Sequence, residues 1–148
     1  MSNDLHIEQE LAMPISNVWE AWTDPVKLQS WLCHLAELDV RADGRFELFW
    51  EPENRERNST LGCSFKEVRK NELLSFSWKG PEDFADLMNQ EPLPTSVAVE
   101  FEEAAPGRTR IRLIHRGWGT SERWQQARQW HDRVWRGALS SLEQLVRD

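Results

Sequence analysis

Two histidines are the residues of this chain best placed to do chemistry. His115 and His131 both fall on apolar faces of the elements expected to carry them, a strand and a helix. Imidazole groups beside a cavity could polarise a carbonyl group, hold a ligand carboxylate or, together with Cys63, bind a metal. The alternative is a pair of neutral core histidines that are satisfied by hydrogen bonds and take no part in binding. The sequence leaves both interpretations open.

Other groups that catalysis or metal binding would need lack the required spacing. No HxxxH or HExxH motif fixes ligands in advance, so no metal is expected. The acidic residues at outward strand positions are typical of a solvated face: Glu37, Asp39, Glu47, Glu100 and Glu102. The sequence contains no nucleophile elbow, glycine-rich phosphate loop or catalytic triad. We therefore assign no catalytic residue and expect no cofactor.

The composition favours an aromatic core and argues against nucleic acid. Nine tryptophans and no tyrosine supply large apolar surfaces with one N–H donor each, but no phenol for acid–base work. The 148 residues suit one domain, and residues 1–148 are expected to form it. The formal net charge of −7 opposes a phosphate backbone, because nucleic-acid affinity comes largely from Lys and Arg.

Cysteine usage and hydropathy indicate the compartment. Cys33 and Cys63 match neither a CxxC redox motif nor a zinc-ligand cluster, so reduced thiols are expected. The first residues lack a basic segment followed by an apolar run, and no stretch approaches the roughly 18 consecutive apolar residues of a membrane span. The sequence thus predicts a cytoplasmic protein without membrane contact.

Hydrophobic periodicity predicts one strand followed by two short helices. Residues 5–11 alternate between apolar and polar side chains, as a half-buried strand does. Pro14 ends this strand, and apolar residues then recur at helical spacing. A second short helix is expected to begin at Asp24 and Pro25, an N-cap followed by proline at the first helical position. Tryptophans at core spacing on both helices are expected to be structural.

A series of strands is expected next. Residues 36–50 alternate again, and Asp43 with Gly44 is typical of a tight hairpin turn in their middle. A further strand should run from Leu61 toward a turn near Asn71. Three more strands are expected around residues 73–78, 97–101 and 109–115.

The rest of the chain predicts a flap and a long helix. Residues 80–94 contain three prolines and one short apolar turn, which indicates a small mobile flap over the open end of a cavity. The last 27 or so residues carry apolar side chains at three- and four-residue steps, including Trp124, His131, Trp135 and Val146. This stripe is typical of a long helix buried on one face.

Six segments together resemble a known family: VWEAWTDPVKLQSWL (18–32), DVRADGRFEL (39–48), LLSFSW (73–78), TSVAVEF (95–101), GRTRIRLIHRGW (107–118) and WRGALSSLEQLV (135–146). The order of these motifs is similar to that of the activator of Hsp90 ATPase homologue 1-like (AHSA1-like) family of the START/Bet v 1 (SRPBCC) superfamily. The resemblance extends over about residues 5–147. The chain departs from it at residues 42–44, in the long flap, and by tryptophans at 118, 124 and 130.

The resemblance implies an α+β helix-grip fold. In this fold a seven-stranded curved antiparallel sheet surrounds a long C-terminal helix, and two short helices follow strand one. Many superfamily members hold small hydrophobic ligands between sheet and helix. Inward-facing positions, with neighbours from the flap and the turn after the sheet, give the candidate ligand-binding residues: Trp50, Phe65, Trp78, Phe84, Phe101, His115, Trp118, Trp124 and His131. A completely filled core is the alternative to a cavity.

Three functions are compatible with these observations. The leading hypothesis is a non-enzymatic module that binds a small hydrophobic, aromatic molecule, with tryptophan and phenylalanine supplying area and His115, His131 or an indole N–H supplying orientation. The second is a cyclase-like enzyme acting on such a ligand, with His131 as the acid–base group. The third is an Hsp90-co-chaperone-like interaction domain, although a chaperone partner is not expected because the chain leaves no room for the N-terminal domain of such co-chaperones. An exposed edge strand leaves a homodimer open.

Overall fold

The structure is a computed structural model that describes residues 3–147. The elements in chain order are β1 (Leu5–Leu11), α1 (Ile15–Thr23), α2 (Pro25–Gln29), β2 (Leu35–Leu38), β3 (Phe46–Phe49), β4 (Phe65–Arg69), β5 (Leu73–Ser77), the 3₁₀ turn η1 (Glu82–Phe84), α3 (Ala85–Met88), β6 (Ser96–Ala105), β7 (Arg108–Arg116) and α4 (Glu122–Arg147). Two short helices thus follow the first strand, and a 26-residue helix comes last, as the sequence predicts. Val146 of the expected apolar stripe lies within this helix, but its side chain is not among those that the structure describes.

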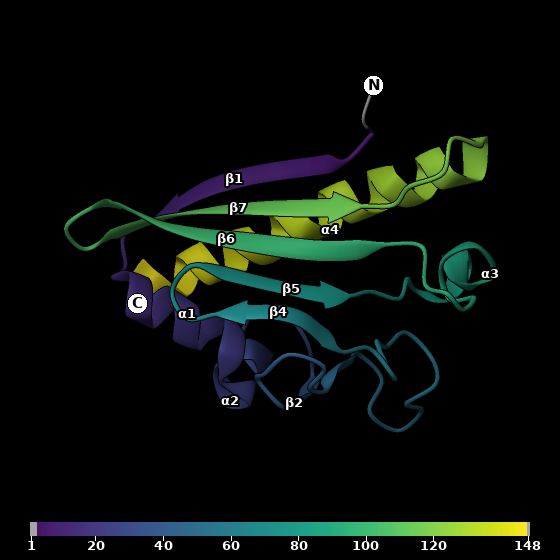
Figure 1. Cartoon of the computed structure of the whole chain (residues 1–148), viewed down its shortest axis with the longest axis horizontal. Helices are drawn as coiled ribbons and strands as arrows, with labels where there is room; N and C mark the ends of the chain where they lie inside the picture. Colours follow the sequence, from purple (N-terminus) through teal and green to yellow (C-terminus); the bar gives the residue numbers. More distant parts are fainter. Residues whose placement is uncertain (1–2, 148) are drawn as a thin grey trace.

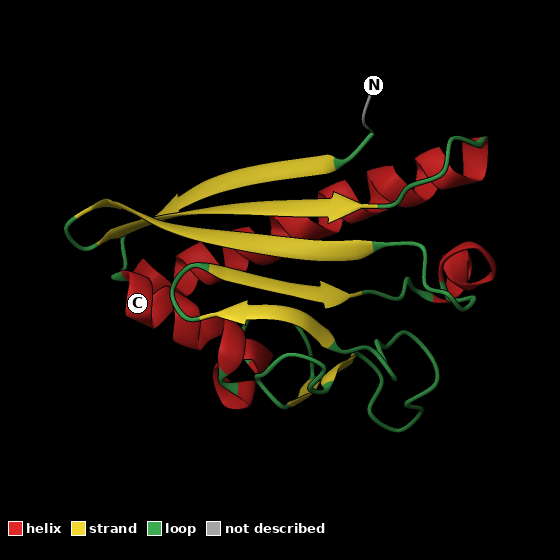
Figure 2. Cartoon of the chain, in the orientation of Figure 1, coloured by secondary structure: helices red, strands yellow, loops and turns green. Residues whose placement is uncertain are grey.

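Five antiparallel strands form the main sheet in the order β1-β7-β6-β5-β4. The long β6–β7 hairpin turns at Gly107, which takes a φ of +74° that favours glycine. Figures 1 and 2 show α4 crossing one face of this sheet diagonally, with the C-terminal end of the helix near α1. The arrangement is an α+β helix-grip fold, as expected.

The two remaining strands form a separate ribbon, β2-β3, so the seven expected strands make two ladders. The ribbon is joined to the main sheet by irregular contacts, in which Phe46 N donates to Cys63 O over 3.0 Å and Phe65 N donates to Gly44 O over 2.8 Å. Thr60 interrupts the ladder because its hydroxyl accepts from the backbone of Leu48 (2.8 Å) and donates to that of Phe46 (3.0 Å). Residues 60–63 then form a turn, in which Cys63 N donates to Thr60 O over 2.9 Å and Gly62 takes a φ of +87°, so β4 begins at residue 65 instead of residue 61.

The connection between β2 and β3 is longer than the predicted tight hairpin. β2 ends at Leu38 and β3 begins at Phe46, which leaves a seven-residue loop. Asp43 takes a positive φ of 65°, as such a turn requires, but Gly44 does not. Gly44 is needed for space instead, because an added Cβ would lie 2.0 Å from Asp39 O. The predicted hairpin is therefore present, but its predicted turn type is wrong.

Tryptophans of α1 and of the turn after α2 close the core. The sequence places Trp31 on the second short helix, but this helix ends at Gln29 and Trp31 lies in the turn that follows. Trp19, Trp22 and Trp31 are all buried, as expected. The rings of Trp22 and Trp31 meet edge to face with centroids 4.8 Å apart, and the Trp31 indole N–H donates to Ala21 O over 3.0 Å. Asp24 caps α2 through a 2.9 Å bond from Val26 N, which confirms the predicted cap.

The segment 80–94 carries η1 and α3 and is packed against the rest of the protein. Met88 is completely buried. The Asn89 side chain accepts from Gly80 N (2.8 Å) and donates to Gly80 O (3.1 Å). Arg123 of α4 forms an ion pair with Asp86. These contacts anchor the segment beside the first turns of α4, and its mobility stays a prediction.

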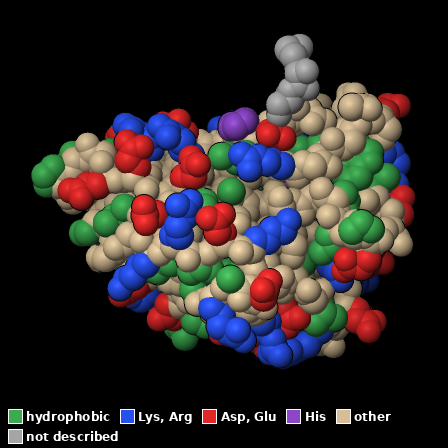
Figure 3. Space-filling model, viewed as in Figure 1, with side chains coloured by type: hydrophobic (Ala, Val, Ile, Leu, Met, Phe, Trp, Pro, Cys, Tyr) green, Lys and Arg blue, Asp and Glu red, His purple; other side chains and the backbone are tan. Residues whose placement is uncertain are grey.

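Ion pairs cover the outward face of the main sheet. Arg110 of β7 contacts Glu8 and Glu10 of β1 and Glu102 of β6 over 2.9 to 3.3 Å. Figure 3 shows Lys, Arg, Asp and Glu side chains interspersed on this face. The outward carboxylates therefore belong to a solvated charged surface.

Candidate functional site

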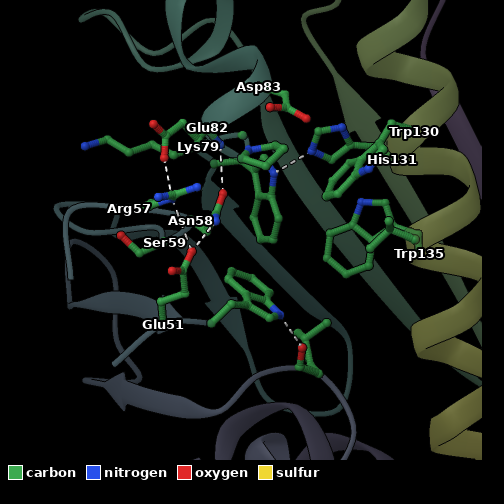
Figure 4. Close-up of a pocket in the computed structure, with 16 residues that line it drawn as sticks. Glu51, Arg57, Asn58, Ser59, Lys79, Glu82, Asp83, Trp130, His131 and Trp135 are labelled. Carbon is green, nitrogen blue, oxygen red and sulfur yellow. Dashed lines mark hydrogen bonds and ion pairs between the residues drawn. The ribbon is translucent and has the colours of Figure 1, made fainter. Parts of the chain in front are cut away.

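A pocket of about 470 Å³ opens between α4 and the segments that follow β3 and β5. Its apolar wall consists of Leu32, Trp50, Trp78, Trp130, Val134 and Trp135, and His131 lies among them. Its polar rim consists of Glu51, Arg57, Asn58, Ser59, Lys79, Glu82 and Asp83. The four α4 residues come from adjacent turns of one helix face. Figure 4 shows Trp130, His131 and Trp135 on the helix side of the pocket, across from Glu51 and Arg57.

Trp78 lies at the centre of the aromatic wall. Its ring centroid is 6.1 Å from that of Trp50 and 5.1 Å from that of Trp135. Trp50 is fixed by its indole N–H, which donates to Leu32 O over 2.8 Å. Because each ring is held by a neighbour or a hydrogen bond, the wall is preformed.

The rim is tied together across the pocket mouth. Asn58 accepts from the backbone N of Glu82 over 2.8 Å and donates to the carboxylate of Glu51. Arg57 forms ion pairs with Glu82 and, at 3.5 Å, with Glu51. These bonds join the loop after β3 to the segment after β5. They fix the shape of the opening.

His131 is buried with both ring nitrogens occupied. Its Nδ1 lies 2.8 Å from Ala127 O, and its Nε2 lies 3.2 Å from the indole nitrogen of Trp78. A carbonyl oxygen can only accept, so Nδ1 carries the hydrogen and Nε2 accepts from Trp78. The imidazole is therefore held in one tautomer and orients Trp78 in the pocket wall.

His115 lies deeper and has the opposite tautomer. Its Nδ1 accepts from the Trp135 indole over 3.1 Å, so its Nε2 donates to Thr95 Oγ1 over 3.2 Å. The indole N–H of Trp118 donates to the backbone oxygen of His115 over 2.8 Å. Each histidine thus anchors one pocket tryptophan.

Burial keeps both imidazoles neutral. Desolvation lowers the pKa of His131 from its ordinary 6.5 to about 4, against a smaller opposing effect of the bond to Ala127. Desolvation, together with the nearby His131, lowers the pKa of His115 well below its usual range. With their nitrogens occupied and their charged forms disfavoured, neither group is poised for acid–base chemistry near neutral pH.

The cysteines and acidic groups form no metal site among residues 3–147. Burial raises the pKa of the Cys33 thiol to about 12 and that of the Cys63 thiol to about 11. Both thiols are therefore protonated at neutral pH, and the thiol is a poor ligand compared with the thiolate. No residue set in this part of the chain is suited to hold a cofactor metal.

The structure brings some of the sequence-predicted site residues together at the pocket. Trp50, Trp78 and His131 line it. Phe84 lies just beyond it, with its ring centroid 6.3 Å from that of Trp130.

A second group of predicted residues lies behind the pocket wall. The rings of His115 and Trp118 lie 5.2 and 5.1 Å from that of His131. Trp124 packs against Trp118 with centroids 6.2 Å apart. None of these three lines the pocket.

Phe65 and Phe101 lie away from the pocket. Phe65 is fully buried against Phe46, with ring centroids 5.3 Å apart, and Phe101 packs against Trp19 of α1 at 5.2 Å. Strand alternation gives the face on which a residue lies, but not its distance along the strand from a pocket.

Sequence reasoning missed Trp130 and the rim residues as parts of the site. Val134 and Trp135 belonged to the apolar stripe of the expected helix, and Trp130 directly precedes His131 in the same turn. Helical spacing could have found these three, because positions 130, 131, 134 and 135 share one face. The rim residues 57–59 lie in a loop without periodicity, which offered no comparable signal.

The sheet, the gripped helix and a pocket beside that helix define a helix-grip α+β protein. The chain belongs to the family of activator of Hsp90 ATPase homolog 1-like proteins, whose model matches residues 12–147. No curated protein matches the sequence. Among the described residues, no helix combines the length and apolarity needed to cross a membrane.

Several solved structures share this fold. Protein MLL2253 from Mesorhizobium loti has a TM-score of 0.77 at 22% identity, covering 98% of this chain and 97% of that one. CalU16 from Micromonospora echinospora has a TM-score of 0.70 at 24% identity, covering 97% and 75%. PFC0360w, an Hsp90 activator from Plasmodium falciparum, has a TM-score of 0.71 at 22% identity, covering 97% and 95%. At these identities the likeness shows the fold alone.

Proposed function

We propose that the protein binds a small, largely apolar and aromatic molecule in the tryptophan-lined pocket without transforming it. The observation that carries this proposal is the convergence of Trp50, Trp78, Trp130 and Trp135 on one pocket of about 470 Å³. This volume lies within the roughly 300 to 1,000 Å³ of small-molecule sites, which are mostly apolar with a few polar groups.

The exposure of the wall supports binding over a filled core. Trp50 and Trp130 are only partly buried, and Val134 is 40% exposed. Indole rings are flat and apolar, and they pack well against aromatic ligands in stacked or edge-to-face geometry. The accessible aromatic surface at the pocket is thus a surface that a flat ligand would cover.

A binding role is better supported than an enzymatic one. The acid–base candidate His131 has both nitrogens bonded within the protein and is neutral because of its burial. A cyclase-like mechanism would need this imidazole to break its bond with Trp78 or Ala127 before it could accept or donate a proton.

The test is a titration with the neutral dye N-phenyl-1-naphthylamine, whose emission rises in apolar surroundings. The informative variant is Val134→Trp, which adds bulk at a partly exposed lining position without removing a core side chain. Gln129→Trp is the matched control, because it places the same side chain at an exposed position of α4 that does not line the pocket. Thermal melts confirm that both variants fold.

We expect dye affinity to fall by roughly tenfold or more in Val134→Trp, which corresponds to about 1.4 kcal/mol. Affinity in Gln129→Trp should stay at the wild-type value. Equal dye binding by wild type and Val134→Trp would show that the dye does not enter this pocket and would contradict the proposal.

A further inference from the structure

Most hydrogen-bond donors of the pocket wall are already bonded to other groups of the protein. The indole N–H groups of Trp50, Trp78 and Trp135 donate to Leu32 O, His131 and His115 respectively. The Nδ1 hydrogen of His131 is bonded to Ala127 O. These side chains therefore present aromatic faces to a ligand and offer it no hydrogen for an anionic group.

The charges at the mouth are predominantly negative. Three carboxylates line the rim, from Glu51, Glu82 and Asp83. The Arg57 guanidinium is shared between Glu51 and Glu82, so its charge is already compensated. Among the side chains of residues 3–145 no ion pair engages the Asp83 carboxylate, although Arg123, which pairs with Asp86, donates to the backbone oxygen of Asp83 over 2.6 Å. Figure 4 places Asp83 at the same end of the pocket as His131 and Trp130.

The remaining rim cation does not offset this charge at the rings. The Lys79 ammonium lies beside Gly62, which does not line the pocket. Its Nζ would be 4.0 Å from a Cβ added to Gly62. Figure 4 shows the Lys79 side chain running outward, away from the tryptophan rings. The three carboxylates of the rim thus outnumber its two cations, Arg57 and Lys79, and the indoles add the negative faces of their rings.

We infer that the pocket selects an organic cation, a quaternary ammonium or protonated amine carried on an apolar body. This inference rests on the proposed binding function and adds the charge of the ligand to it. Aromatic faces attract cations most strongly when the cation is desolvated, and tryptophan is the best partner. A carboxylate at the mouth adds attraction for the same charge and repels anions.

The test compares three ligands of similar size and different charge. Phenyltrimethylammonium is the cation, tert-butylbenzene is its uncharged isostere, and benzenesulfonate is the anion. Each is titrated against the dye-loaded protein, and displacement gives its dissociation constant. We expect the cation to bind roughly tenfold or more tighter than tert-butylbenzene, as a desolvated cation–π contact would give, and benzenesulfonate to bind weakest.

Two charge-matched variants locate the effect. Asp83→Asn removes a rim carboxylate and should weaken binding of the cation by about threefold, with tert-butylbenzene unchanged. Glu53→Gln removes the same net charge from an exposed residue that does not line the pocket and should leave both affinities unchanged.

The outcomes separate this inference from the proposed function. If tert-butylbenzene or benzenesulfonate binds as tightly as the cation while the dye still binds in the pocket, the cation preference is overturned and the binding function stands. If the dye itself fails to bind, the proposed binding function and the cation preference are both overturned. An equal loss in Asp83→Asn and Glu53→Gln would overturn the part of the inference that assigns Asp83.

Discussion

Acidification should destabilise this protein through its two buried histidines. His131 is 1% exposed, and burial lowers its pKa from 6.5 to about 4. Above pH 6.5 the imidazole is neutral in the folded and unfolded chain, so its full contribution to stability is present. Between pH 6.5 and 4 the unfolded chain binds a proton that the folded chain does not, so stability falls as the pH falls. The difference amounts to roughly 3 kcal/mol for His131, and His115 acts in the same direction.

Urea unfolding at several values between pH 7 and pH 4 measures this loss. His131→Leu leaves the Trp78 N–H without its partner and should cost about 1 to 3 kcal/mol at pH 7, but it should show a shallower loss toward pH 4. His6→Gln, at an exposed strand position, should keep the wild-type dependence and controls for removal of a histidine. An equal pH dependence in wild type and His131→Leu, or a His131 imidazole NMR signal that titrates near pH 6.5, would refute the reasoning.

Two further substitutions test the packing around the site. Trp31→Ala removes a side chain that is only 7% exposed, together with its hydrogen bond to Ala21 O. The free energy of unfolding should fall by about 3 to 5 kcal/mol. A loss under about 1 kcal/mol in urea melts would contradict the place of Trp31 in the core. Gly117→Ala should cost at least about 1 to 3 kcal/mol, because Gly117 has a φ of +100° and an added Cβ would lie 1.9 Å from Pro94 O. Gly137→Ala is its control: outside the backbone of its own helix and its two chain neighbours, nothing lies within 4 Å of the added Cβ, and the helix should gain up to about 1 kcal/mol in the same melts.

Much of the fold could be predicted from the sequence because its elements have strong periodicity. The strand 5–11, the capped helix at Asp24 and the long amphipathic helix each follow from local patterns that the structure confirms. The two errors in the strands have local causes. Residues 60–63 form a turn with Gly62 at a φ of +87°, and Gly44 is required by space instead of by φ. Neither cause can be read from spacing.

The candidate site was less accessible to sequence reasoning. Alternation placed Phe65 and Phe101 on the inward face, but their positions along the strands put them against Phe46 and Trp19. Partners of the histidines come from elements far apart in the chain, such as Trp78 with His131, and no local pattern fixes such pairs. The same long-range packing decides which tryptophans keep an accessible face.

The indole N–H resonances of the nine tryptophans test the central claim most directly, because each ring reports on its own surroundings. In a ¹⁵N-resolved NMR titration with N-phenyl-1-naphthylamine, the proposed function predicts the largest shifts at Trp50 and Trp130, with smaller shifts at Trp78 and Trp135. Trp19, on α1, and Trp31, two residues after the end of α2, do not line the pocket and should stay in place. Saturating binding that shifts Trp19 and Trp31 as much as Trp50 and Trp130, or that shifts none of the four lining tryptophans, would contradict the account.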